Sequence, residues 1–388
     1  METRSLDSAD VARSFDIRTR SFGTMPESAR EGWESDARVA IGEGRAVAAY
    51  DGTELVGRAV IRPFRQWWGG RDLPMAGMAG VVVAPEHRGR GVGTLLMRGT
   101  IERSRDLGYP LSALYPATVP VYRSLGWEIA GAQHRFTMEA RLLRDLRGGQ
   151  VHVREARPAD AAAMFDILRR QYAAGRACGP RDFPETELRE DLADSSVFGY
   201  LADDGFVLYG WEGSDLRVHC LLAGSTETNK SLWATVGSGS SIAKRVHAYL
   251  APDDPVHQLL SEMVAAEATQ VRWMLRLLDL PAAVAGRGFP AGLEVEVPLE
   301  VVDAEVPQNC LAGTLQVSGG KGELAARPGG AADADAVRLG ANGIAALYAG
   351  TPVSSLLTAG LATGGSAQAR ALLDAAFAGR SAYLLDYF

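Results

Sequence analysis

The chain has 388 residues and 47% hydrophobic content, which is too long for one ordinary core and predicts two or three domains with full interiors. Its formal net charge of -7 argues against non-specific nucleic-acid binding, which needs clustered Lys and Arg, and suits a cationic amine as partner. No apolar run approaches the ~20 residues that span a bilayer, and no apolar segment follows Met1-Glu2-Thr3-Arg4. We therefore expect no membrane insertion and a cytoplasmic location.

The cysteines and histidines form no recognisable disulfide or metal pattern. Cys178, Cys220 and Cys310 are odd in number and widely separated, and the six histidines contain no pair at metal-ligand spacing. We expect buried or free thiols and no metal site.

The N-terminal part of the chain contains signals for one helix and several strands. Asp7 to Asp10 offers an N-cap for an apolar periodic segment. The Asp51-Gly52 turn between two strand-like runs is typical of a hairpin. The predicted elements are a helix at 11–22 and strands at 45–50, 55–61, 73–83 and 111–114.

A glycine-rich turn between a strand and a helix is the most informative feature of the sequence. Val81 to Val83 suit a buried strand, and apolar residues recur at helical spacing from Thr94 to Ile101. The glycines between Gly89 and Gly93 let the backbone approach a ligand closely, and the amides at the helix N-terminus point at it. The turn therefore predicts a pyrophosphate site.

Two other phosphate-binding loops do not fit this turn. A Walker loop would need a lysine before Thr94, and a dinucleotide fingerprint would need glycines spaced Gly-x-Gly-x-x-Gly rather than Gly-x-Gly-x-Gly. An ordinary glycine-rich strand-to-helix turn stays as the alternative.

The middle of the chain looks like a second start of the same kind of domain. A new unit begins at 150–153, and Arg157 to Asp160 cap a helix through Met164 and Leu168. No glycine turn of the first kind appears between residues 160 and 290, which suggests a copy without a cofactor site.

The last part of the chain has a different pattern of apolar and polar residues. Apolar residues from Leu293 to Leu299 alternate mainly with Glu, which predicts a half-exposed strand and suggests an antiparallel sheet. Further expected elements are short strands at 315–317, 323–325 and 336–339 and helices at 343–348 and 367–377.

The run Arg88-Gly89-Arg90-Gly91-Val92-Gly93 is similar to the Arg/Gln-x-x-Gly-x-Gly/Ala signature of GNAT acetyltransferases. With the stretches 113–127 and 273–280, the chain as a whole resembles the Eis family. This resemblance implies an α/β (α+β) fold with a catalytic GNAT domain at 1–149, a degenerate GNAT domain at 150–290 and a sterol carrier protein-like domain at 291–388. It also implies acetyl-CoA as co-substrate and a homo-hexamer.

The resemblance also assigns roles to single residues. It makes Tyr122 the general acid and the terminal carboxylate of Phe388 the general base. A phenol near the sulfur can protonate the departing thiolate, and a carboxylate with a pKa of ~3.5 must be buried to act as a base. The alternatives are an aromatic anchor for Tyr122 and a frayed chain end for Phe388. The residues expected to hold the cofactor are Val81, Val82, Val83, Arg88, Gly89, Arg90, Gly91, Val92, Gly93, Thr94, Ala117 and Thr118.

The expected acceptor is a primary amine of a small, aminoglycoside-like polyamino compound. The alternatives are protein lysines, or a non-catalytic carrier that binds a lipid and senses acetyl-CoA. Tyr387 stands where active family members often carry a carboxylate. Some side chains either line an acidic mouth for a polycation or are merely solvated: Glu27, Glu31, Glu34, Asp36 and Asp386. Trp33, Trp67 and Trp68 are candidates to face the same opening, and the alternative for the pair Trp67-Trp68 is core packing or a subunit contact.

Overall fold

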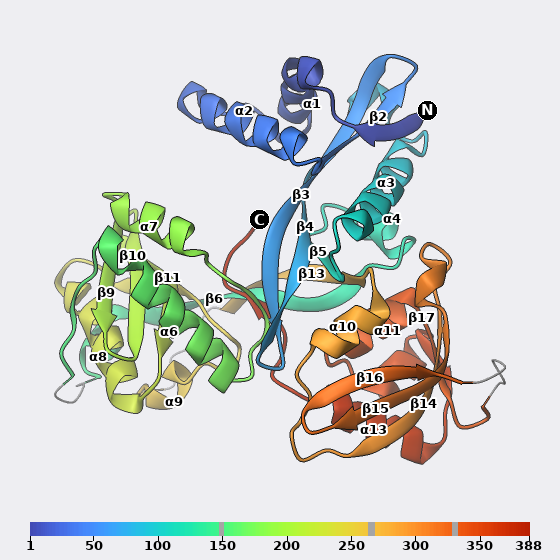
Figure 1. The fold of residues 1–388 in the computed structure, drawn as a ribbon. Helices are drawn as coiled ribbons and strands as arrows, with labels where there is room; N and C mark the ends of the chain where they lie inside the picture. Colours follow the sequence, from blue (N-terminus) through green and yellow to red (C-terminus); the bar gives the residue numbers. More distant parts are fainter. Residues whose placement is uncertain (147–150, 263–267, 328–332) are drawn as a thin grey trace.

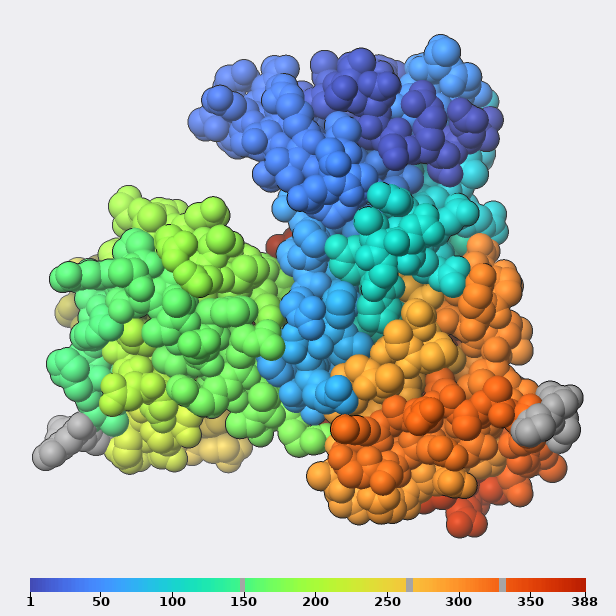
Figure 2. Space-filling model, in the orientation of Figure 1, coloured from blue at the N-terminus to red at the C-terminus, as the bar shows by residue number. Residues whose placement is uncertain are grey.

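The computed structural model describes residues 1–146, 151–262, 268–327 and 333–388. The predicted domain boundary at 149/150 lies outside the described residues. Three lobes follow one another along the chain (Figure 1). Figure 2 shows a recess between the first and second lobes, in which the dark red atoms of the C-terminal end are visible. The described part of the chain contains no helix long and apolar enough to cross a membrane.

A single sheet of 14 described strands runs through the first two lobes, in the order β1-β2-β3-β4-β5-β13-β6-β12-β11-β10-β9-β7, with β19 on β6 and β8 on β3. The strands of the first lobe are β1 (Glu2–Ser5), β2 (Ala46–Asp51), β3 (Glu54–Trp68), β4 (Arg71–Val83), β5 (Leu111–Leu114) and β6 (Glu128–Glu139). Those from the rest of the chain are β7 (Arg154–Glu155), β8 (Cys178–Arg181), β9 (Val197–Ala202), β10 (Gly205–Glu212), β11 (Asp215–Ala223), β12 (Arg245–Tyr249), β13 (Ala268–Leu277) and β19 (Tyr383–Leu384).

The first two lobes exchange strands at their junction. Strand β13, from late in the chain, lies between β5 and β6 and is antiparallel to both. Strand β6 then pairs with β12 on its other edge. The sheet order thus differs from the chain order, although the predicted local elements of the first lobe are confirmed.

Helices cover both faces of the sheet in the first lobe. Asp7 accepts a hydrogen bond from the Ala9 amide and caps the first turn, as expected. Ile17 and Ala40 pack on one face of the sheet, and Leu96 and Met97 pack on the other. The helices are α1 (Val11–Phe22), α2 (Glu27–Gly42), α3 (Val92–Asp106) and α4 (Val119–Arg123). Helix α2 was not predicted from the sequence.

The second lobe repeats this arrangement. Met164 and Leu168 pack on one face of its strands, and Trp233 packs on the other. The predicted helix after Asp160 is confirmed. The helices are α5 (Ala140–Arg144), α6 (Ala161–Ala174), α7 (Glu185–Ala193), α8 (Thr226–Gly237) and α9 (Val256–Leu259).

The third lobe is an α+β domain with a separate sheet in the order β16-β15-β14-β17-β18. The expected antiparallel sheet is wrong in one place, because β14 and β17 pair in parallel across a long connection. Its strands are β14 (Val295–Val302), β15 (Leu311–Ser318), β16 (Lys321–Ala326), β17 (Val337–Gly340) and β18 (Ala362–Gly364). Its helices are α10 (Leu280–Gly286), α11 (Ala341–Tyr348), α12 (Val353–Thr358) and α13 (Ala367–Phe377).

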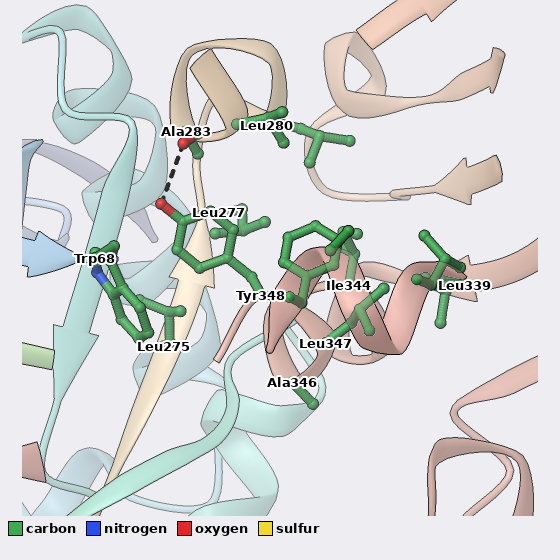
Figure 3. Close-up of a cluster of buried hydrophobic side chains, with 14 of the residues drawn as sticks. Trp68, Leu275, Leu277, Leu280, Ala283, Leu339, Ile344, Ala346, Leu347 and Tyr348 are labelled. Atoms are coloured by element: carbon green, nitrogen blue, oxygen red, sulfur yellow. Dashed lines mark hydrogen bonds between the residues drawn. The ribbon is translucent and has the colours of Figure 1, made fainter. Parts of the chain in front are cut away.

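One continuous apolar core joins the third lobe to the long hairpin that β3 and β4 form in the first lobe. Trp68 is fully buried, and its ring packs against the rings of Trp273 and Tyr348. Figure 3 shows Tyr348 reaching from α11 to donate a hydrogen bond of 3.1 Å to the Ala283 carbonyl. Trp67 is also buried and donates to Asp182. This Trp pair is therefore core packing between lobes.

The C-terminal segment returns from the third lobe to the first two. Strand β19 pairs in parallel with β6 at Ala132 and Gln133. A Cβ atom at Gly131 would lie 2.2 Å from the Ala382 carbonyl, and one at Gly179 would lie 2.6 Å from backbone of Tyr383. Only glycine allows this close approach on both sides. The chain end is thereby held between β6 and β8.

Candidate active site

Strands β4 and β5 lie side by side over only part of their length. They pair in parallel from Met75 to Gly77 against Leu111 to Ala113, while β4 continues to Val83. The far end of β4 therefore has a backbone edge that β5 does not cover. Uncovered amide and carbonyl groups on such an edge are available to an extended ligand.

A β-bulge bends the same end of β4. Across the pairing with β3, Arg58 lies opposite Val82 while Val60 lies opposite Ala79, so β4 carries one extra residue. Gly80 stands at this bulge with φ at +55°, a conformation that favours glycine. The bulge interrupts the ladder at Gly80 and Val81, and Val82 and Val83 pair again with Arg58 and Gly57.

The glycine turn leads from β4 into α3. Gly89 and Gly91 have φ of +74° and +82°, and Gly91 is the N-cap of the helix without a side-chain cap. A Cβ atom at Gly89, Gly91 or Gly93 would meet no atom within 4 Å, so the space in front of the helix is open. Uncapped amides and the helix dipole both favour an anionic group there. The turn thus fits the diphosphate of an acyl-CoA.

A cavity of about 510 Å³ unites these features. Its wall is formed by the end of β4, the glycine turn, the first turns of α3, the start of α4 and the last residues of α1. The lining residues are Ser21, Phe22, Val81, Val82, Val83, His87, Arg88, Gly89, Gly91, Val92, Gly93, Thr94, Met97, Ala117, Thr118, Val121 and Tyr122.

The cavity brings together all but one of the residues predicted to hold the cofactor. The exception is Arg90, whose guanidinium donates to His87 Nδ1 at 3.1 Å and pairs with Asp51 at 3.4 Å. Arg88 lines the cavity and donates to the Ser21 hydroxyl and the Val83 carbonyl. Arg88 therefore ties α1 to the end of β4.

Tyr122 lies in the wall of this cavity at the end of a short helix. Helix α4 begins with Pro120 in its first turn, and Gly126 closes the following turn with φ at +92°. The Tyr122 ring is only 6% exposed and packs edge-on against Trp127 at 6.3 Å. Burial raises the pKa of the Tyr122 phenol, and the nearby Tyr387 phenol raises it further. The hydroxyl is therefore protonated at neutral pH.

Phe388 does not line the cavity but lies on the neighbouring part of the sheet. Its ring packs edge-on against Phe64 at 5.0 Å and Tyr115 at 5.6 Å. Tyr115 also donates a hydrogen bond of 2.8 Å to the Asp386 carbonyl and stacks on Tyr387 at 4.2 Å. The last three residues are thus fixed to the first lobe.

Side chains from β8 and β6 also hold the same segment. Arg181 donates to Asp386 at 2.5 Å and forms two further bonds to Glu187 at 2.7 and 2.8 Å. Gln133 donates to the Leu385 carbonyl at 3.1 Å. These anchors and the cavity residues Phe22 and Val121 were missed from the sequence, where no local motif marks them.

Among the described residues, no cluster of three or more His, Cys, Asp or Glu is placed to hold a metal ion. All three cysteines are free.

Comparison with known families divides the chain as the geometry does. Residues 2–130 and 184–277 match two models of the acetyltransferase (GNAT) domain, and residues 280–385 match a sterol carrier protein domain. The two GNAT domains and the sterol carrier-like domain expected from the sequence are confirmed. Their boundaries at 149/150 and 290/291 stay predictions. GNAT enzymes use an acyl-CoA donor.

Similar proteins extend the match over most of the chain. The N-acetyltransferase Eis of Mycobacterium tuberculosis is 32% identical over 303 residues, which cover 72% of this chain and 74% of that protein. A GCN5-related N-acetyltransferase structure from Kribbella flavida is 49% identical, with a TM-score of 0.96 and coverage of 100% of this chain and 98% of the other. Eis1 from Mycobacterium abscessus shares the fold, with a TM-score of 0.77 at 23% identity and full coverage of both chains. The chain therefore belongs to the Eis family and is a GNAT-type N-acetyltransferase.

Proposed function

We propose that the enzyme transfers the acetyl group of acetyl-CoA to a primary amine of a small molecule by direct attack. The observation that carries this proposal is the single cavity that joins the uncovered edge of β4, the open glycine turn and the Tyr122 phenol. Acetyl-CoA supplies the acetyl group as a thioester when it is bound. Val81 to Val83 would bind the extended arm of this ligand, and Gly89 to Thr94 would bind its diphosphate.

Two groups of the chain handle protons in this proposal. Tyr122 keeps its proton at neutral pH because burial raises its pKa, so it can donate that proton to the departing sulfur. The main-chain carboxylate of Phe388 accepts the proton that the attacking ammonium must lose. The contacts of Phe388 with Phe64 and Tyr115 support this role, since a base must be held within reach.

The chemical identity of the acceptor is a separate part of the proposal. Two of the carboxylates considered as an acidic mouth are held in short ion pairs: Glu34 contacts Arg30 at 3.1 Å and Arg38 at 3.0 Å, and Asp386 is bound by Arg181. A small polyamino acceptor and a homo-hexamer stay predictions from the family resemblance. Protein lysine is the second candidate, and a non-catalytic carrier is not proposed because the chain is a GNAT-type N-acetyltransferase.

The test is steady-state release of CoA from acetyl-CoA with a panel of aminoglycosides, polyamines, amino acids and lysine peptides. Mass spectrometry of each product locates the acetyl group. Acetylation of at least one small amine by the wild-type enzyme, lost in Tyr122→Phe, is expected. Exclusive acetylation of folded proteins or peptides would refute the small-molecule proposal.

A further inference from the structure

A second cavity lies between α2 and the paired strands β3 and β4. It has a volume of about 210 Å³, and its wall includes Trp33, Arg58, Arg62 and Gly80. Gly80 is the residue before Val81, so the two cavities adjoin along one strand. The glycine is needed here, because a Cβ atom at Gly80 would lie 3.1 Å from one Arg58 nitrogen.

Arg58 is a buried cation without a counter-ion in the described structure. Arg58 is 4% exposed, and its Nε has no hydrogen-bond partner among the described residues. Its guanidinium lies over the Trp33 ring at 4.9 Å. The charged groups acting on it are Arg18 and Arg62, which have the same sign. Burial and these two neighbours lower the pKa of Arg58 to about 10, so it stays positively charged at neutral pH. Buried charges are ordinarily paired, and an unpaired one is costly.

The carboxylates near this cavity do not neutralise Arg58. Asp36 is exposed at the cavity wall and forms no ion pair with any described residue. Glu43 is occupied by Arg45, which also donates to the Ile61 carbonyl at 2.8 Å. An anion that enters from solution would therefore find an unoccupied planar donor group, the kind that binds carboxylates through two parallel hydrogen bonds.

The chain end lies next to this cavity. Side chains alternate along a strand, so Arg58, Arg62 and Phe64 point to the same face of β3. Arg62 and Phe64 are separated by roughly 7 Å along the strand, and Phe64 contacts the ring of Phe388. Arg62 also lies opposite Gly77, whose Cβ position is 3.1 Å from the same ring. The cavity and the Phe388 ring thus lie next to each other along β3 and β4, and β4 continues to the residues proposed to face the acyl donor.

We propose that Arg58 binds a carboxylate of the acceptor, so that the enzyme acetylates a small primary amine that also carries an acid group. The inference rests on the proposed function, since it places the acceptor beside both Phe388 and β4. A dense polycation would instead meet the guanidinium groups of Arg58 and Arg62. The role of Arg58 is to hold the acceptor while the amine reaches the thioester.

The test compares ligands that differ only in the carboxylate. Lysine, lysinamide and cadaverine are titrated calorimetrically into the wild-type protein loaded with CoA, where no transfer can occur. Turnover with acetyl-CoA is then measured for the same three amines and for ornithine against putrescine. We expect lysine to bind about 10- to 100-fold more tightly than lysinamide or cadaverine, the range of a charge-assisted hydrogen bond.

Substitutions at Arg58 test whether this residue causes the preference for lysine over lysinamide and cadaverine. Arg58→Met should lower kcat/KM for lysine by about 10- to 100-fold through KM, with little change for cadaverine or in the KM of acetyl-CoA. Arg58→Lys, which keeps the charge but not the fork, should retain part of the preference. The control is Arg38→Met, which removes an exposed arginine of α2 outside the cavity and should leave all values unchanged.

The outcomes separate this inference from the proposed function. Equal binding of the three amines, no binding of lysine at millimolar concentration, or equal losses for lysine and cadaverine in Arg58→Met would each overturn it. Turnover of cadaverine without preference for lysine would leave the proposed function intact. Lysine binding that depends on Arg58, with no acetyl transfer to any small amine of the wider panel, would support the anion site and refute the proposed function. The binding comparison on the wild-type protein decides the question if Arg58→Met does not fold.

Discussion

Replacing Tyr122 with phenylalanine isolates the proton donor from the packing of the ring. The hydroxyl forms no hydrogen bond with any described residue, whereas the ring packs in the apolar cluster with Trp127. The substitution should therefore change the free energy of unfolding by less than about 1 kcal/mol. Turnover should fall by ~100-fold, equivalent to about 2.7 kcal/mol in the activation barrier. The dissociation constant of acetyl-CoA should stay unchanged.

The pH dependence gives a second check on the same variant. Because the pKa of Tyr122 is raised above its ordinary value of about 10, the wild-type phenol stays protonated up to that pH. The loss in Tyr122→Phe should thus be constant from neutral to mildly alkaline pH. The assay is kcat by CoA release, with the melting temperature and acetyl-CoA binding measured alongside.

Tyr109→Phe is the matched control. Tyr109 is a half-buried tyrosine that packs against the same apolar cluster but does not line the donor cavity. It should retain full turnover. Retention of more than half of the activity in Tyr122→Phe, or a parallel loss of acetyl-CoA binding, would refute the assignment of Tyr122 as general acid.

Three further predictions test the donor site, the chain end and a buried acid. Gly91→Asp puts a negative charge in the open space before α3 and should weaken acetyl-CoA binding by ~10-fold or more. The uncharged control Gly91→Asn should weaken binding less, and equal affinities of the two variants would contradict an electrostatic cause. A glycine added after Phe388 moves the terminal charge by up to ~3.5 Å and should greatly reduce turnover without changing acetyl-CoA affinity or melting temperature, so full activity would exclude that carboxylate as the base. Burial raises the pKa of Asp254 to about 6 in the folded state, so the wild type loses stability as pH rises through the window from about 4 to 6. Asp254→Asn should therefore be more stable than the wild type above pH 6, by at most about 3 kcal/mol, and no different below pH 4, as measured by urea unfolding at several pH values.

Local signals in the sequence predicted most of the segments that line the cavity of about 510 Å³. The strand that ends at Val83, the glycine turn and the helix after it depend on neighbouring residues, and the structure places them as expected. Strand β5 and helix α13 have the predicted bounds of 111–114 and 367–377. In each case the pattern of apolar residues within one segment decides the structure.

The features that were missed depend on contacts between distant segments. Helix α2 buries only Ala37 and Ala40, so its apolar stripe is too weak to detect as a period. In the sequence, Arg58 looks like an ordinary charged residue of a strand. Only the folded structure shows that Trp33 of α2 covers it. Arg90 lies within the glycine signature, yet its side chain is drawn away by His87 and Asp51.

The placement of β13 between β5 and β6 affects how the protein can be synthesised. Strand β5 ends at residue 114, whereas β13 begins at residue 268, so the N-terminal lobe cannot close its sheet until most of the second lobe has left the ribosome. Until then the edges of β5 and β6 lack their partner and can pair with other chains. Pairing over such a sequence separation also slows folding. We therefore expect the two GNAT lobes to fold as one unit and neither of them to be stable alone.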